Sequence, residues 1–178
     1  MFDFSFVVST IALCLYSASY FFNSKKIYLI LQLSGNVFLS LSYLLIGSYF
    51  TMVSVVLGIA RGLICYVYEK KEKRVPAYVI AGLCFVTILS YVIINYVILS
   101  QASAWDVLYL IASCMYAITF AIRNIRAMRY TVLIPHSLAV IYNLLIKAPI
   151  SSAISYGIEL AVTVVAIIKF EIQRLKHR

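Results

Sequence analysis

Long apolar runs, separated by short polar segments, follow one another along the whole chain. Each run approaches the ~20 apolar residues that a helix needs to cross a bilayer. The runs are continuous and do not alternate between apolar and polar positions, so they predict helices and not the strands of a membrane barrel. The predicted spans are Phe4–Phe22, Ile27–Gly47, Phe50–Tyr68, Val75–Ser100, Ala104–Ile122, Tyr130–Ala148 and Ser151–Lys169.

The composition also indicates a membrane protein. Of the 178 residues, 64% are apolar or aromatic and 12% are charged, whereas a soluble domain has about 45–50% and about 25%. A chain of this length has too little interior to bury so much apolar surface. We therefore expect an all-α integral membrane protein with seven transmembrane helices. The first residues lack the basic segment and cleavage site of a signal peptide, so we expect the first run to remain as a span.

The basic residues lie between the spans with a strong asymmetry. Twelve of the fifteen Lys and Arg residues lie in the first, third and fifth loops and the C-terminal tail, whereas the even-numbered loops contain only Lys147. An excess of Lys and Arg marks cytoplasmic loops. This pattern predicts seven spans with the N-terminus outside and the C-terminus in the cytoplasm. It also accounts for the net charge of +9 without a nucleic-acid partner.

The two halves of the chain match each other at a constant offset of 100 residues. Ile11–Tyr16 aligns with Ile111–Tyr116, and Leu44–Ile46 aligns with Leu144–Ile146. The polar positions that this offset pairs are Lys26 with Arg126, Asn36 with His136, and Tyr43 with Asn143. A constant offset over several helices indicates an internal repeat.

The repeat predicts a 3+1+3 architecture. Residues 1–74 form the first three-helix repeat, residues 75–100 a linker transmembrane helix, and residues 101–178 the second repeat with a short basic cytoplasmic tail. Because three spans cross from outside to inside, a single linker span lets the second unit start outside again. The two repeats are then parallel, the arrangement of SWEET transporters, and the substrate sites of such folds lie at the repeat interface near the bilayer midplane.

Two ionisable side chains lie inside predicted spans, where each costs about 2.5–3.5 kcal/mol on insertion scales. One residue deleted in the loop before them aligns Gly58-Ile59 with Gly157-Ile158, and hence Ala60 with Glu159. Arg61 and Glu159 are therefore neighbours in the repeat alignment. We expect them to form an ion pair across the repeats at a central cavity. Two alternatives remain open: Arg61 extends to the cytoplasmic interface, and Glu159 is a protonated carboxyl that bonds within the bundle.

Polar stripes at helical spacing mark the second and sixth spans. Because the stripes coincide under the repeat, we expect them to line a shared polar cavity; the alternative is that they only join helices by hydrogen bonds. The predicted cavity residues are Arg61, Glu159, Gln32, Asn36, Tyr43, His136 and Asn143. Glu159 and His136 are also the candidates for coupling to protons.

Catalytic and metal-binding patterns do not emerge from the sequence. The four cysteines lie inside predicted spans without CxxC spacing, and His136 is the single intramembrane histidine. The HExxH, Walker and nucleophile-elbow motifs are missing from the sequence. We expect no catalytic residues, no metal and no cofactor, and hence not an enzyme.

Six short motifs, spread over nearly the whole chain, carry a family resemblance. They are NSKK at 23–26, LQL at 31–33, SYLLIGSY at 42–49, LGIAR at 57–61, IYN at 141–143 and GIE at 157–159. With these motifs the chain resembles the YgjV family of bacterial inner-membrane proteins. The resemblance implies an inner-membrane location, with Arg61, Asn143 and Glu159 at typical positions of the family.

The repeat layout resembles that of the SWEET and PnuC transporters, as a likeness of fold alone. The sequence has no Pro-Gln dipeptide, and Pro76, Pro135 and Pro149 do not form the matched prolines of a SWEET hinge. Trp105 is the single tryptophan, in contrast to the tryptophan-rich pocket of PnuC. Neither a sugar nor nicotinamide riboside is therefore implied as the substrate.

The sequence favours a small-molecule transporter or facilitator that works by alternating access in the lipid bilayer. Its partner would be a small polar solute that the sequence does not identify, and the choice between a monomer and a homo-oligomer stays open. The alternative is a non-transporting membrane protein, such as a partner subunit or a sensor, whose polar residues only hold the bundle together.

Overall fold

The computed structural model describes residues 4–45, 49–94, 104–145 and 150–176. Within these ranges all regular structure is helical, and the seven helices confirm the number and type of elements that the apolar runs predict. The helices are α1 (Phe4–Ser19), α2 (Lys25–Leu45), α3 (Tyr49–Lys70), α4 (Ala77–Val92), α5 (Asp106–Ala121), α6 (Ile125–Leu145) and α7 (Ile150–Lys176). Lys147 and the predicted span ends at Gly47, Ser100 and Ala148 lie outside the described residues.

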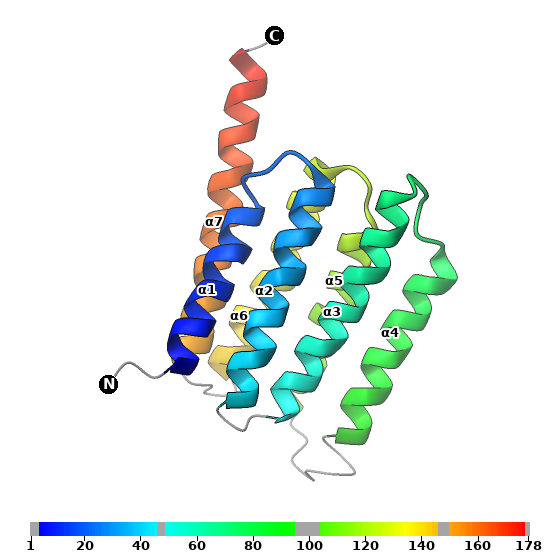
Figure 1. Cartoon of the computed structure of the whole chain (residues 1–178), viewed down its shortest axis with the longest axis vertical. Coiled ribbons are helices and arrows are strands. Elements are labelled where there is room, and N and C mark those ends of the chain that lie inside the picture. The colour runs from blue at the N-terminus through cyan, green and yellow to red at the C-terminus, as the bar shows by residue number, and fades with distance from the viewer. Residues whose placement is uncertain (1–3, 46–48, 95–103, 146–149, 177–178) are drawn as a thin grey trace.

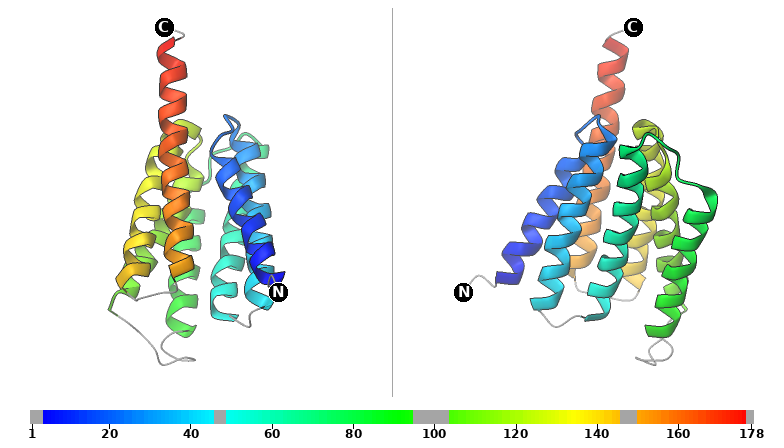
Figure 2. Two further views of the ribbon diagram at one scale, coloured as in Figure 1. Left: turned by 90° about the vertical axis from the view of Figure 1, so that its left-hand side faces the viewer. Right: turned by 45° about the vertical axis from the view of Figure 1, so that its right-hand side comes forward.

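The helices run alternately up and down, so neighbours in sequence are antiparallel neighbours in space (Figure 1). α2 packs against α1 and α3, and α6 packs against α5 and α7. Figure 2 shows α1–α3 on one side of the bundle and α5–α7 on the other. α4 packs mainly against α5, and smaller contacts of α1 with α7 and of α3 with α5 join the two sides.

Charged side chains gather at one end of the bundle. The segments 20–24, 71–76 and 122–124 join helices at this end, where α7 also ends (Figure 1). Lys25 Nζ lies 3.1 Å from Glu69 Oε2, and Arg126 Nε lies 2.6 Å from Glu171 Oε1. This is the end that the excess of Lys and Arg predicts to face the cytoplasm.

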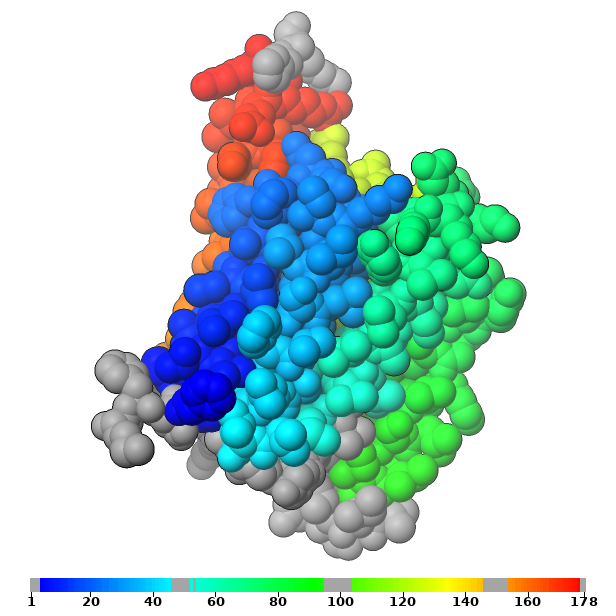
Figure 3. Space-filling view, in the orientation of Figure 1, coloured from blue at the N-terminus to red at the C-terminus, as the bar shows by residue number. Residues whose placement is uncertain are grey.

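At this charged end α2 and α3 extend two residues beyond the predicted spans, and α6 and α7 extend five and seven residues beyond them. α6 begins at Ile125, although the sequence predicts a polar loop through Arg129. The side chain of Asn124 accepts hydrogen bonds from two backbone N–H groups of the first turn, at 2.9 and 3.4 Å, and so caps the earlier start. α7 continues past Lys169 to Lys176 and projects from the bundle (Figure 3). Hydropathy locates the apolar part of a helix but not its polar extension.

The outer faces of the bundle are apolar. Within the described ranges, α2 is the one helix long and apolar enough to pass as a membrane span, while α1, α4 and α5 are apolar with 16 residues each. A helix of that length extends about 24 Å, slightly less than the ~30 Å hydrocarbon core. Large apolar side chains, among them Phe85, Leu144 and Ile154, are exposed on the outside. A surface of this kind is unusual in water and fits contact with lipid.

The buried core lies between the two sides of the bundle. Six helices, or the turn that follows them, contribute to it, and α4 does not. Its residues are Tyr20, Tyr28, Leu29, Cys65, Phe120, Met128, Val132 and Ala166. This core places the aromatic rings of the first half directly against α5 and α6, next to the candidate site.

Candidate functional site

His136 of α6 is the centre of a buried polar cluster. Its side chain is enclosed, with 1% of the residue exposed. Tyr20 Oη lies 2.6 Å from His136 Nε2, and Tyr116 Oη lies 2.6 Å from His136 Nδ1. A neutral imidazole has one donor and one acceptor nitrogen. One tyrosine therefore donates a hydrogen bond to the ring and the other accepts one from it.

Glu159 of α7 completes this cluster. Its Oε2 lies 3.7 Å from His136 Nδ1, and its side chain is nearly buried. One turn further along α7, the hydroxyl of Thr163 donates a hydrogen bond of 2.7 Å to the Glu159 carbonyl. We name Tyr20, Tyr116, His136 and Glu159 the His136 cluster. The turn after α1 and the helices α5, α6 and α7 each supply one member, so the cluster lies where the two halves of the bundle meet.

Arg61 of α3 contacts α5, and the predicted ion pair with Glu159 is wrong. Arg61 Nη1 donates a hydrogen bond of 2.8 Å to the carbonyl of Ser113, in the middle of α5. Its guanidinium lies 5.6 Å from the ring centres of both Tyr116 and Phe120. A carbonyl and two aromatic faces thus stabilise the cation where we expected a carboxylate. Since Ser113 is mid-helix, Arg61 does not extend to the charged end of the bundle either.

The polar stripe of α2 joins α2 to α1. Gln32 Nε2 donates to Ser19 Oγ at 3.0 Å, and Asn36 Oδ1 accepts a hydrogen bond of 3.1 Å from Tyr16 Oη. Asn36 Nδ2 also donates to the Gln32 carbonyl at 2.9 Å. In this conformation the side chains of Gln32 and Asn36 therefore form hydrogen bonds with α1 and within α2. Such bonds are what the alternative interpretation of the stripe expects.

Asn143 and Tyr43 lie toward the other end of the bundle and take no part in the hydrogen bonds of the His136 cluster. Asn143 of α6 is buried, and its Nδ2 donates a hydrogen bond of 2.7 Å to the carbonyl of Ala139, one turn earlier. Tyr43 of α2 is half-buried. Of the seven predicted residues, the structure thus brings His136 and Glu159 into the His136 cluster. Arg61 lies beside this cluster, because its guanidinium is next to the ring of Tyr116, which bonds to His136.

Sequence reasoning placed Tyr20 and Tyr116 outside the candidate site. One signal for Tyr116 was present, since the 100-residue offset aligns Tyr16 with Tyr116 and Asn36 with His136. Each of these tyrosines is twenty residues before its partner, and each bonds to it. Tyr20 has no such signal, because its aligned position is Phe120.

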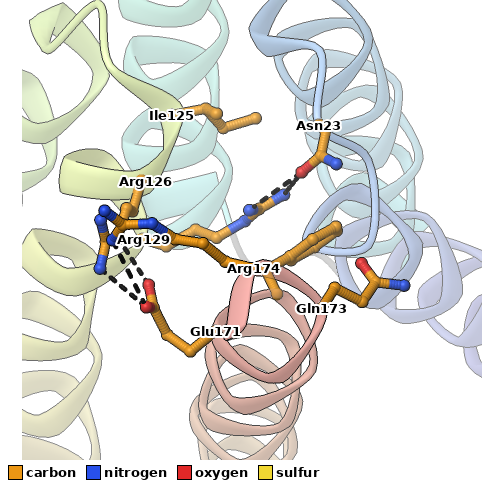
Figure 4. A pocket seen from close by; sticks show the side chains of 8 residues that line it. Asn23, Ile125, Arg126, Arg129, Glu171, Gln173 and Arg174 are labelled. Carbon is orange, nitrogen blue, oxygen red and sulfur yellow. Dashed lines mark hydrogen bonds and ion pairs between the residues drawn. The ribbon is translucent and has the colours of Figure 1, made fainter. Parts of the chain in front are cut away.

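Two pockets open away from the His136 cluster. The first has a volume of about 460 Å³ and lies at the charged end, between the turn at Asn23 and the helices α6 and α7 (Figure 4). The second, of about 340 Å³, lies between α3 and α4 among mostly apolar side chains, with Arg61 at its wall. Of the seven predicted cavity residues, Arg61 alone lines either of these two pockets.

The part of the chain that the structure describes has no group of three or more His, Cys, Asp or Glu side chains placed to hold a metal ion. Its four cysteines are free thiols, and Cys84 Sγ donates a weak hydrogen bond of 3.9 Å to the backbone carbonyl of Cys114. The chemistry of the candidate site is therefore that of a histidine, a carboxyl group and two phenols.

Comparison with known proteins identifies the family of the chain. No curated protein and no solved structure matches the chain. The model of one family, Imp-YgjV, described as bacterial inner membrane protein, matches residues 3–174. This match covers all seven helices almost to the end of α7, and the chain therefore belongs to the Imp-YgjV family of bacterial inner membrane proteins.

Proposed function

We propose that the protein is a small-molecule transporter or facilitator of the inner membrane, and not an enzyme. The observation that carries the proposal is the buried His136 cluster at the junction of the two halves. Ionisable groups inside membrane helices are costly and typically mark the path of a substrate or a proton. In transporters with parallel repeats, the substrate site lies at this same interface.

Equivalent contacts in the two halves support two parallel three-helix repeats, α1–α3 and α5–α7, linked by α4 in a SWEET-like layout. The Tyr16–Asn36 bond corresponds to the Tyr116–His136 bond at the offset of 100 residues. The helices α2 and α6 also begin and end 100 residues apart. In several pairs of positions separated by 100 residues, both residues are buried, among them 12 and 112, 19 and 119, 28 and 128, and 32 and 132.

Transport would proceed by alternating access, with α1–α3 rocking against α5–α7. Such a movement separates Tyr20 from His136, because these residues belong to different halves. The freed imidazole and the Glu159 carboxyl could then bind a small polar solute or a coupling proton. Gln32, Asn36, Tyr43 and Asn143 would add hydrogen bonds, and Arg61 would set the charge of the opened cavity.

We further propose seven membrane crossings with the N-terminus outside and the C-terminus in the cytoplasm. The asymmetry of basic residues supports this orientation. The helices α1, α3, α5 and α7 all end at the charged end of the bundle, as the orientation requires (Figure 1).

The test is a thermal-unfolding screen of the purified protein in detergent against nucleosides, vitamins, sugars, amino acids and quaternary amines. A ligand at a hundredfold excess over its Kd stabilises the folded state by about 2.7 kcal/mol. The ligand found is then supplied to proteoliposomes that contain the wild type, Glu159→Gln, or the exposed control Glu72→Gln. We expect Glu159→Gln to fold and to lose uptake while Glu72→Gln retains it; equal uptake by both variants removes Glu159 from the mechanism.

A non-transporting membrane protein is the second candidate, and the bonds of Gln32, Asn36 and Asn143 within their own halves favour it. Cysteines introduced at Asn36 and Asn143, in a background without the four native cysteines, distinguish the two functions. Reaction with an aqueous maleimide supports transport because water then reaches the stripes. Complete protection in every condition supports a structural role.

A further inference from the structure

The pocket at the charged end carries more positive charge than its own acidic residue balances. Three arginines line it, together with one carboxylate and the neutral side chains of Asn23 and Gln173 (Figure 4). The arginines are Arg126, Arg129 and Arg174, and the carboxylate is Glu171. The volume of about 460 Å³ lies within the ~300–1,000 Å³ range of ligand pockets.

The carboxylate of Glu171 forms its main ion pair with Arg126. Arg126 Nε and Nη2 lie 2.6 and 2.7 Å from the two carboxylate oxygens, a bidentate pair. Arg174 Nη1 lies 3.9 Å from Oε2, beyond hydrogen-bond distance. The Arg174 guanidinium lines the pocket, and within the described residues its donors form no hydrogen bond.

Arg129 is a buried cation, and its contacts within the described residues are all with neutral groups. It is 3% exposed, and its Nη2 donates a hydrogen bond of 2.6 Å to the Phe22 carbonyl. Both terminal nitrogens lie 3.4 Å from Asn23 Oδ1, and the guanidinium stacks 3.9 Å from the centre of the Phe170 ring. Within the described residues, its buried Nε has no hydrogen-bond partner. A buried charge without a counter-ion is unfavourable, so the pocket has a physical reason to attract an anion.

The pocket lies at the level where the apolar sequence ends. The sixth predicted span begins at Tyr130, beside Arg129, and the seventh ends at Lys169, before Phe170. Headgroups of anionic lipids and soluble cytoplasmic anions both reach this level. Guanidinium groups match the oxygens of phosphate in charge and in bidentate geometry.

We propose that this pocket binds a phosphate group, carried either by an anionic phospholipid or by a soluble phosphate compound. Arg174 and the Arg126 side chain contact the phosphate oxygens, Arg129 supplies the uncompensated charge behind them, and Gln173 and Asn23 add neutral donors. The inference does not depend on transport, since the pocket shares no residue with the His136 cluster.

The test uses the full chain in nanodiscs of phosphatidylcholine alone, in nanodiscs with added phosphatidylglycerol, and in phosphatidylcholine nanodiscs with inorganic phosphate at constant ionic strength. The thermal unfolding midpoint and native mass spectrometry of retained lipid report binding. The variants are Arg126→Gln/Arg174→Gln and Arg174→Gln alone, which leaves the Arg126–Glu171 pair intact. The control Arg123→Gln/Lys176→Gln removes the same charge from exposed positions outside the pocket.

Stabilisation by phosphatidylglycerol alone identifies a lipid headgroup, whereas stabilisation by inorganic phosphate in phosphatidylcholine identifies a soluble ligand. In either case we expect binding to weaken about tenfold in the double pocket variant, the loss of roughly one charge-assisted hydrogen bond, and to stay unchanged in the control. The proposal is overturned if neither probe stabilises the wild type, or if the control loses as much affinity as the pocket variants.

Discussion

Tyr20 and His136 are 116 residues apart in the sequence, and the Tyr20 hydroxyl lies 2.6 Å from His136 Nε2. The two rings meet edge to face, with centres 5.8 Å apart. Tyr20 belongs to the first half of the bundle, whereas Tyr116, on the other imidazole nitrogen, belongs to the same half as His136. The orientation of the imidazole is therefore fixed from both halves, and a movement of one half against the other changes the hydrogen bonds of His136.

Tyr20→Phe removes the hydroxyl that joins the halves and keeps the ring in the core. A buried nitrogen left without its partner costs about 1–3 kcal/mol, so we expect a loss of stability in that range in equilibrium unfolding in detergent. Tyr78→Phe is the control, because Tyr78 is exposed and the same hydroxyl is removed. Equal stability of the two variants would show that the Tyr20–His136 contact contributes nothing.

Arg61→Lys preserves the charge of Arg61 but not its planar shape. Lysine cannot both donate to the Ser113 carbonyl and spread over the faces of Tyr116 and Phe120, so we expect a loss of about 1–2 kcal/mol in unfolding free energy. The exposed control Arg74→Lys should unfold like the wild type. If Arg61 acts only through its charge, Arg61→Lys will match that control.

Gly35→Ala is expected to break the Tyr16–Asn36 bond. A Cβ atom at Gly35 would lie 2.6 Å from Tyr16 Cε1, so the Tyr16 ring has to move. Overpacking of this kind typically costs about 1–3 kcal/mol. Gly82→Ala is the matched control, since its Cβ would meet nothing within 4 Å and alanine is the better helix former by about 1 kcal/mol. The unfolding free energy should fall for Gly35→Ala and hold or rise for Gly82→Ala.

The helices and the charged end of the bundle follow from the sequence because they depend on local properties. The apolar runs place seven helices, and the lysines and arginines mark the end where three loops and α7 meet. The start of α6 and the end of α7 were harder to predict because Asn124 and the Arg126–Glu171 pair continue helical structure through polar sequence. The Arg126–Glu171 contact joins two helices and depends on the folded chain, whereas the Asn124 cap is local to the start of α6.

The members of the candidate site were only partly predictable. His136 and Glu159 stand out as ionisable residues in apolar runs, yet hydropathy cannot tell which of several buried groups will meet. Arg61 illustrates the difficulty. It lies next to Ala60, the position that aligns with Glu159 in the repeat, but the Arg61 side chain reaches the Ser113 carbonyl on α5. The sequence does not predict the roles of Tyr20 and Tyr116, because a tyrosine in an apolar run is usually a packing residue and its hydrogen-bond partner is known only from the structure.

Of the ion pairs at the charged end, we expect the Lys25–Glu69 pair to cause the largest loss of stability when one partner is removed. Lys25 is the first residue of α2 and Glu69 lies in the last turn of α3, so each charge sits at the helix end where the macrodipole disfavours it. Their side chains are 5% and 15% exposed, and the 3.1 Å contact compensates both. Glu69→Gln would leave a buried ammonium without its carboxylate, and we expect a loss of about 3–5 kcal/mol in unfolding free energy.

Glu171→Gln provides the contrast for this prediction. Its pair with Arg126 is 30% and 47% exposed, and exposed pairs contribute only about 0.2–1 kcal/mol. The double change Lys25→Met/Glu69→Met should recover most of the stability that Glu69→Gln loses, because replacing a buried pair by apolar side chains is often neutral. Similar losses for Glu69→Gln and Glu171→Gln, or no recovery in the double variant, would show that burial does not decide the strength of the pair.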